Sequence, residues 1–165
     1  MILQPGRTVP SRGNTGKQYG VLIVDDDASV FAAMRRALAD VGSVGFVDPA
    51  ASLAESRDLL SSRAYGVVLL DLGLPDGNGL ELVPWLRDFP RSPEVIVVTG
   101  AAPEGAEIAL RQGVWDFLSK PFSTQELQLG VERALRYYEE KKERTQTSPH
   151  ISGMVGTSPA LRRSV

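Results

Sequence analysis

Short apolar runs alternate along the chain with longer segments in which apolar residues recur every three or four positions. The runs cover residues 20–24, 44–47, 67–70, 95–98 and 114–118, and most are rich in valine, isoleucine and leucine. Continuous runs of this length are typical of strands that are buried on both faces. Helical spacing is clear over 30–41 and 104–112 and weaker over 53–60 and 80–89, where Pro84 should delay or distort the helix. Strand and helix therefore alternate five times.

This alternation decides the fold class. Successive parallel strands need right-handed crossover connections, and each crossover helix covers one face of the sheet or the other. We therefore expect an α/β domain with a doubly wound, five-stranded parallel sheet, five helices and an extended C-terminal helix. In open parallel sheets, ligands bind beyond the carboxyl ends of the strands. The chemistry of the protein is expected at that edge.

Composition divides the chain into four segments. Residues 1–18 are rich in glycine and small polar residues, which predicts a disordered tail, and residues 19–140 hold the strand and helix patterns. A capping box of Ser123 and Glu126 should begin the last helix, expected over about 124–142. The polar end of this helix could pair with a second copy as a short coiled coil. A linker is expected over residues 141–150, and the helix should give way to a Thr/Gln/Ser/Pro stretch from residue 145. Residues 151–165 are interpreted as the truncated start of a downstream domain.

Composition and charge exclude several classes of function. The 165 residues include no cysteine and one histidine, His150, which excludes disulfide scaffolds and thiolate metal sites and argues against a catalytic triad. The net charge is −2, but residues 20–140 carry 19 acidic and 10 basic side chains, between two basic tails. Such an acidic domain is poorly suited to binding nucleic acid directly. No segment has the apolar length of a membrane span or the pattern of a signal peptide, so we expect a cytoplasmic protein with no membrane contact.

Four of the five predicted strands lead into a polar functional group. Asp25 and Asp26 follow the first strand, Asp71 the third, Thr99 the fourth and Lys120 the fifth. Because parallel strands end at one edge, these side chains should lie close together. Clustered carboxylates without histidine or cysteine favour a hard cation, most plausibly Mg²⁺. An aspartate beside Mg²⁺ and a lysine can act as a nucleophile toward a phosphoryl group.

Each residue also has a simpler interpretation. Asp27, the third acid of the run, is expected to cap a helix or support the other acids from outside the metal site. Thr99 alone would be a turn residue and Lys120 alone a surface lysine, so their shared strand-end position carries the argument. A phosphohydrolase could use the same acids. It usually has a second acid two residues after the nucleophile, whereas position 73 is glycine.

The set of motifs resembles the receiver domain of bacterial two-component response regulators. The resemblance covers about residues 19–140 and includes, in order, Val21-Leu22-Ile23-Val24-Asp25-Asp26-Asp27, Leu69-Leu70-Asp71-Leu72-Gly73-Leu74-Pro75 with Asn78-Gly79, Val98-Thr99-Gly100 and Ser119-Lys120-Pro121-Phe122. It implies a flavodoxin-like sheet with strand order 2-1-3-4-5.

The resemblance also implies roles for individual residues. Asp71 matches the phosphoacceptor, Asp25 and Asp26 match the acidic pair that holds Mg²⁺, and the backbone carbonyl of Gly73 completes the metal site. Thr99 and Lys120 match the groups that bind the phosphoryl oxygens.

Two further positions follow from the same resemblance. Phe117 matches the aromatic switch position, where simple core packing is an equally good interpretation. The peptide bond before Pro121 is expected to be cis.

The end of the chain is similar to the opening of the AAA+ domain in sigma-54-dependent activators of the NtrC type, through Val155-Gly156, Ser158-Pro159 and Ala160-Leu161. This resemblance implies a sensor histidine kinase as phosphodonor and a downstream AAA+ domain under control. It also implies a homodimer through the face between the fourth and fifth helices and through the linker helix. The receiver would catalyse only its own phosphorylation and dephosphorylation, so it is not an enzyme in the usual sense. A stand-alone receiver that sequesters a partner is the alternative.

Overall fold

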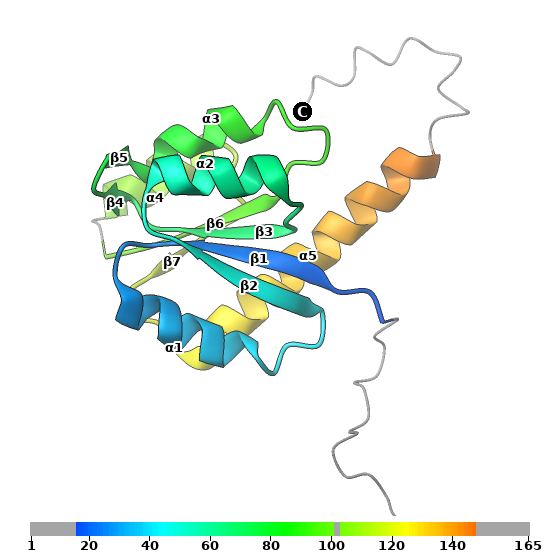
Figure 1. Ribbon diagram of the computed structural model, residues 1–165, viewed down its shortest axis with the longest axis horizontal. Helices are drawn as coiled ribbons and strands as arrows, with labels where there is room; N and C mark the ends of the chain where they lie inside the picture. The colour runs from blue at the N-terminus through cyan, green and yellow to red at the C-terminus, as the bar shows by residue number, and fades with distance from the viewer. Residues whose placement is uncertain (1–15, 101–102, 148–165) are drawn as a thin grey trace, which may run out of the picture.

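A five-stranded parallel sheet forms the centre of the protein in a computed structural model that describes residues 16–100 and 103–147 (Figure 1). Its strand order is β2-β1-β3-β6-β7, which confirms the predicted order 2-1-3-4-5. All four neighbouring pairs within this sheet are parallel. The strands are β1 (Tyr19–Val24), β2 (Val44–Ala50), β3 (Val67–Leu70), β6 (Glu94–Thr99) and β7 (Asp116–Ser119).

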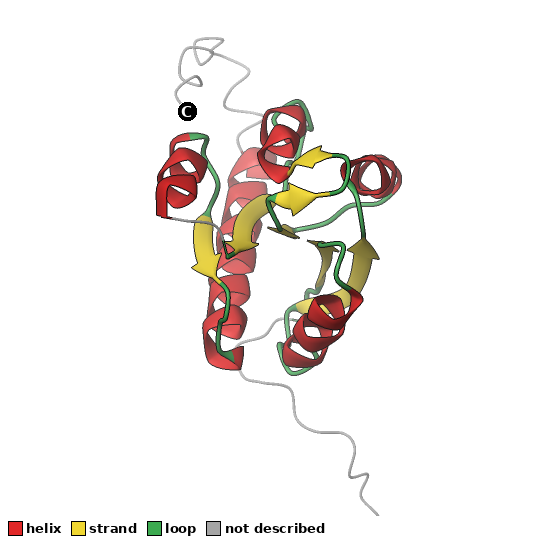
Figure 2. Ribbon diagram, turned by 90° about the vertical axis from the view of Figure 1, so that its left-hand side faces the viewer, coloured by secondary structure: helices red, strands yellow, loops and turns green. Residues whose placement is uncertain are grey.

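Helices cover both faces of the sheet (Figures 1 and 2). Helices α1 (Ala28–Leu38) and α5 (Thr124–Thr147) pack on one face, and α2 (Leu53–Ser62), α3 (Leu82–Leu86) and α4 (Pro103–Arg111) on the other. Strand β1 shows why both faces are apolar: Val21 and Ile23 join the core beneath α1 and α5, whereas Leu22 and Val24 join the core beneath α2 to α4. Alternating side chains of a central strand thus point into two separate hydrophobic cores.

The weak third helical pattern has a physical explanation in Pro84. A short 3₁₀ helix, Gly79–Glu81, comes first, and α3 begins only at Leu82, so the proline lies in the first α-helical turn. An amide at that position has no helical partner, and a proline there is tolerated. The expected late and distorted helix over 80–89 is confirmed, although the α-helix itself ends at Leu86.

Several element boundaries differ from those predicted. Two additional strands, β4 (Gly73–Leu74) and β5 (Gly77–Asn78), form a small antiparallel hairpin, which two-residue strands cannot reveal through periodicity. Strand β2 continues through Pro49 to Ala50, as an edge strand can. The fifth strand of the main sheet runs from Asp116 rather than from Val114.

Helix α5 is longer than expected. It continues to Thr147, so the chain does not break at residue 145 as predicted (Figure 1). The sequence contains no proline between Pro121 and Pro149, and a residue that precedes proline disfavours helical backbone. The predicted tail over 1–18 falls mainly, and the predicted downstream segment 151–165 entirely, outside the described residues.

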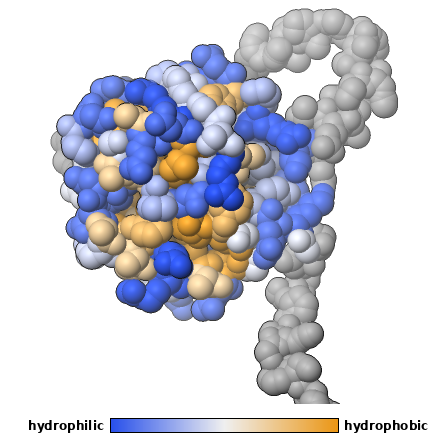
Figure 3. Space-filling view, viewed as in Figure 1, coloured by the Kyte–Doolittle hydropathy of each residue, from blue (hydrophilic) through white to orange (hydrophobic). Residues whose placement is uncertain are grey.

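Polar and apolar side chains are both present on the outer surface. In the view of Figure 3, hydrophobic residues gather over the part of the face where β2 lies in Figure 1, with hydrophilic residues around them. Strand β2 is an edge strand whose Val44, Phe46 and Val47 are only partly buried. Across residues 16–100 and 103–147, we find no helix with the length and apolar content needed to span a membrane.

Candidate functional site

The predicted site residues come together at the carboxyl ends of strands β1, β3, β6 and β7. Asp25 follows β1, Asp71 follows β3, Thr99 ends β6 and Lys120 follows β7. Backbone hydrogen bonds extend the sheet to these positions: the amide of Asp71 donates to the carbonyl of Val24 at 2.9 Å, and that of Lys120 donates to Thr99 at 3.1 Å. The sheet itself therefore fixes the spacing of the site residues.

Three carboxylates converge at this edge. One oxygen from each of Asp25, Asp26 and Asp71 can be chosen so that all three lie within 4.8 Å of one another. Asp25 is buried, with 6% of its surface exposed, whereas Asp71 is partly buried and Asp26 is exposed. An all-oxygen donor set with one open, solvent-facing side suits Mg²⁺, which retains some of its water ligands in protein sites. The residues present thus fit the expected cation.

Lys120 provides the positive charge of the site. Its Nζ lies 2.9 Å from Oδ2 of Asp25 and 3.8 Å from Oδ1 of Asp71. Burial lowers the pKa of Lys120, but the hydrogen bond to Asp25 and the attraction of Asp71 and Asp25 outweigh this effect, so the pKa is raised overall. Lys120 is therefore firmly protonated and stands within reach of a group bound at Asp71.

The surroundings of Asp71 disfavour the charged form of its carboxyl group. Burial raises its pKa, and the negative charge of Asp25 adds to that effect. Lys120, a hydrogen bond with the side chain of Thr99 and the backbone amide of Leu72 act in the opposite direction without cancelling the rise. One ammonium group thus faces several carboxylates, and the site retains an excess of negative charge that a bound cation would offset.

Asp27 takes the role of a helix cap, as its simpler interpretation predicted. Its Oδ1 accepts hydrogen bonds from the backbone amide of Ser29 at 2.9 Å and from the Ser29 hydroxyl at 2.7 Å. These hydrogen bonds lower the pKa of Asp27. Its own amide donates to Oδ1 of Asp25 at 2.9 Å, so the start of α1 also orients the buried acid.

The remaining predicted residues lie around this cluster. Thr99 is buried at the end of β6, with 5% of its surface exposed, and Phe117 of β7 is partly buried against the core beneath α2 to α4. Gly73 lies two residues after Asp71, exposed at the start of β4. The peptide bond between Lys120 and Pro121 is cis.

Two residues near the site were given no role in the site by the sequence analysis. Gly79 donates its amide hydrogen to the Leu72 carbonyl at 2.8 Å, and a Cβ at this position would overlap the backbone carbonyl oxygen of Asp71. The motif that includes Gly79 did not indicate this contact, because a close approach between segments leaves no periodic pattern. Asp76, at the tip of the β4–β5 hairpin, accepts hydrogen bonds from two amides of α2.

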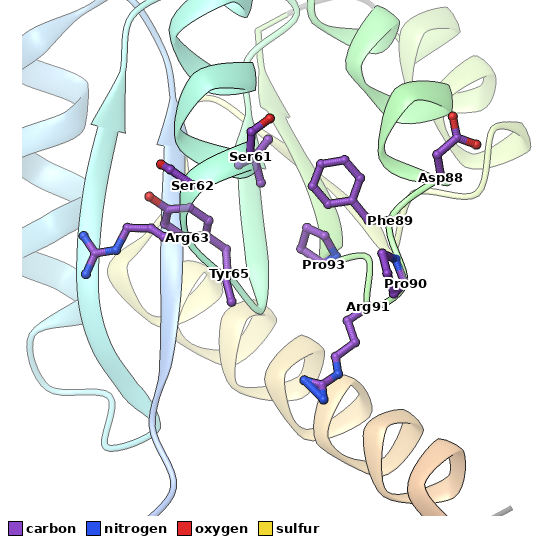
Figure 4. Close-up of a pocket in the computed structure, with 11 residues that line it drawn as sticks. Ser61, Ser62, Arg63, Tyr65, Asp88, Phe89, Pro90, Arg91 and Pro93 are labelled. Atoms are coloured by element: carbon purple, nitrogen blue, oxygen red, sulfur yellow. The ribbon is translucent and has the colours of Figure 1, made fainter. Parts of the chain in front are cut away.

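A pocket at the other edge of the sheet is separate from this chemistry (Figure 4). It lies near the amino ends of β3 and β6, between Tyr65, Phe89 and Pro93. Its Arg63 side chain pairs with Asp48 at 2.9 Å rather than facing an open anion site. The pocket therefore adds no group to the cluster around Asp71.

Comparisons with known proteins agree with this geometry. The chain matches the family described as response regulator receiver domain over residues 21–132. It is 31% identical over 149 residues to the DNA-binding transcriptional regulator NtrC of Escherichia coli strain K12, which covers 88% of this chain and 31% of NtrC. It is also 39% identical over 117 residues to the KDP operon transcriptional regulatory protein KdpE of that strain, covering 70% of this chain and 51% of KdpE. The chain thus spans less than a third of NtrC.

Solved structures show the same similarity. The beryllofluoride-activated NtrC4 receiver domain dimer aligns with a TM-score of 0.66 and 30% identity, over 72% of this chain and 98% of that chain. The receiver domain of NtrX from Brucella abortus aligns with a TM-score of 0.64 and 30% identity, over 70% and 98% of the two chains. Both thus share the overall fold of this chain.

Proposed function

Because the chain belongs to the response regulator receiver domain family, we propose that it accepts a phosphoryl group on Asp71 and uses it as a signal. The observation that carries this proposal is the convergence of Asp25, Asp26 and Asp71 with Lys120, whose Nζ lies 2.9 Å from Asp25 and 3.8 Å from Asp71. Phosphoryl transfer depends mainly on positioning and charge neutralisation, so this small set of groups is sufficient.

The proposed reaction is a single displacement at phosphorus. A carboxylate oxygen of Asp71 attacks the donor phosphorus, the bond to the leaving atom breaks, and the leaving group keeps the electron pair. With a histidine kinase as donor, the leaving atom is a nitrogen of the phosphorylated imidazole. Asp25, Asp26, Asp71 and the Gly73 carbonyl would hold Mg²⁺, which offsets carboxylate and phosphoryl charge when bound.

Lys120 and Thr99 supply the response to phosphorylation. The protonated Lys120 can pair with a phosphoryl oxygen, and the buried Thr99 hydroxyl can donate a hydrogen bond to another. These new contacts would draw the ends of β6 and β7 toward Asp71 and shift the packing of Phe117, a residue of β7, against the core beneath α2 to α4. A local charge change thus becomes a change in the face built by α4, β7 and α5.

The likeness to NtrC supports an output in transcription. NtrC is named as a DNA-binding transcriptional regulator, and NtrC4 as a receiver domain dimer. We propose that this receiver dimerises through the face between α4 and α5 and through the extended α5, and that it controls a downstream AAA+ module that acts with sigma-54. We also propose a cytoplasmic location for this receiver, because the proposed kinase partner would draw on cytoplasmic ATP.

A phosphotransfer assay tests the proposed function. The chain is incubated with Mg²⁺ and a small acyl phosphate, and the phosphoryl group per chain is counted by intact-mass spectrometry. We expect one labile phosphoryl group, lost when Mg²⁺ is chelated before the reaction and lost in Asp71→Asn, but retained in Asp88→Asn, which removes an exposed acid far from the site. An equal adduct on Asp71→Asn contradicts the proposal. Turnover of a generic phosphomonoester far beyond one equivalent would favour the alternative, a phosphohydrolase.

A further inference from the structure

The β4–β5 hairpin follows Asp71 in the chain and lies beside the beginning of α2 (Figure 1). Asp76 is at its tip. The Oδ1 atom of Asp76 accepts a hydrogen bond from the amide of Leu53 at 2.8 Å, and Oδ2 accepts one from the amide of Ala54 at 3.0 Å. One carboxylate thus connects the hairpin to a helix that is 22 or more residues away in the sequence.

The other end of this hairpin is attached closely to Asp71. The amide of Gly79 donates to the Leu72 carbonyl, and Gly79 packs so tightly that a Cβ would overlap the Asp71 carbonyl oxygen. Asn78 and Glu81 form a reciprocal capping box just after the hairpin. The segment from Asp71 to Glu81 therefore has few degrees of freedom, and a displacement at Asp76 would reach the strand end that carries Asp71.

Helix α2 has a cap of its own, which separates two possible roles of Asp76. Ser52 is the N-cap residue of α2, and its hydroxyl accepts a hydrogen bond from the amide of Glu55 at 3.1 Å. The carboxylate of Asp76 binds two other amides of the first turn, where a negative charge is favourable. Those hydrogen bonds also lower the pKa of Asp76, so the charge is retained. Asp76 therefore links the β4–β5 hairpin to α2, a helix that already has its own N-cap.

We propose that Asp76 is a positioning residue for the phosphoacceptor site. By fixing the hairpin to α2, it holds the backbone of Gly73 and the strand end at Asp71 in the arrangement that binds Mg²⁺. This inference rests on the proposed function, because it concerns the same cation. Asp76 itself does not touch the three clustered carboxylates, so its effect passes through the hairpin backbone.

A comparison of two capping variants tests the inference. Mg²⁺ binding is measured by isothermal titration calorimetry and by NMR shifts of the Asp71 and Gly73 amides, for Asp76→Ala and for Ser52→Ala. Both variants remove a cap from α2, but only Asp76→Ala frees the hairpin. Loss of the groups that orient metal ligands, without binding the metal themselves, commonly lowers metal affinity by roughly 10-fold or more. We expect Mg²⁺ affinity to fall by roughly 5- to 10-fold in Asp76→Ala and by less than about 2-fold in Ser52→Ala.

The possible outcomes separate the inference from the proposed function. An Mg²⁺ affinity of Asp76→Ala equal to that of the unaltered chain, or an equal loss in both variants, overturns the positioning role. If Asp76→Ala does not fold, Asp76→Asn, which keeps one acceptor oxygen, should fold and show an intermediate affinity. An unaltered affinity in Asp76→Asn together with an unaltered Gly73 amide shift would also overturn it. Failure of the unaltered chain to bind Mg²⁺ would instead contradict the proposed function.

Discussion

The ion pair between Glu94 and Lys141 allows a quantitative test of how the long C-terminal helix is held. Glu94 is the first residue of β6, whose last residue is Thr99, and Lys141 lies near the C-terminal end of α5. The Nζ atom of Lys141 is 2.5 Å from Oε2 of Glu94. The perturbation is Lys141→Met, which removes the charge and preserves most of the aliphatic side chain.

The burial of the two partners sets the expected magnitude. The side chain of Glu94 is 11% exposed, whereas that of Lys141 is 36% exposed. Removing one partner costs about 3–5 kcal/mol in a fully buried pair and about 0–1 kcal/mol at the surface. Because this pair is partly open to solvent, we expect Lys141→Met to lower the free energy of unfolding by about 1–3 kcal/mol. The double variant with Glu94→Gln should recover about 1 kcal/mol, since no buried carboxylate remains unpaired.

The assay is urea unfolding followed by circular dichroism, with a double-mutant cycle. Arg136→Met is the matched control, because it removes an exposed positive charge from the same helix. We expect this control to change the free energy of unfolding by less than about 0.5 kcal/mol. Equal effects of Lys141→Met and Arg136→Met, or a coupling energy near zero, would refute the reasoning that the ion pair anchors α5 to the sheet.

Three other changes have expected outcomes. Burial and Asp25 raise the pKa of Asp71, so its stabilising contribution is present below the unfolded pKa, ordinarily 3.8, and is lost as pH rises through the folded pKa. Asp71→Asn should therefore raise the melting temperature at neutral pH, with a gap that closes toward acidic pH; a constant gap would argue against this cause. Gly79→Ala should cost about 1–3 kcal/mol and slow phosphorylation, because the added Cβ displaces the Asp71 carbonyl; normal phosphorylation kinetics would contradict that contact. Asp27→Ala should lower the free energy of unfolding in denaturant through loss of the α1 cap, and an unchanged stability would contradict the capping role.

Much of the fold was predictable because each strand of the central sheet is marked by a pattern of neighbouring residues. Each central strand is a continuous apolar run, since both faces are covered, and each run leads directly into the polar residue that reaches the site. The position of Asp71 after β3 and of Lys120 after β7 followed from the same pattern. Parallel strands then bring these residues to one edge without further information.

The parts that could not be predicted depend on contacts between distant segments. The bonds from Leu53 and Ala54 to Asp76 join α2 to a hairpin that has no periodic signal. The pair of Glu94 with Lys141 has a similar origin, because its residues are 47 positions apart. The polar sequence near the end of α5 suggested pairing with a second copy and did not indicate contacts within the domain. Tyr137 nevertheless stacks on Trp115, with ring centroids 4.8 Å apart.

The identity of the phosphorylated residue tests the central claim most directly. After reaction with a small acyl phosphate and Mg²⁺, the chain is reduced with borohydride, which converts an aspartyl phosphate to a stable alcohol, and its peptides are mapped by mass spectrometry. The site described above predicts modification of Asp71 alone among the 20 acidic residues. Modification of another acid, or of none while Mg²⁺ is bound, would contradict it.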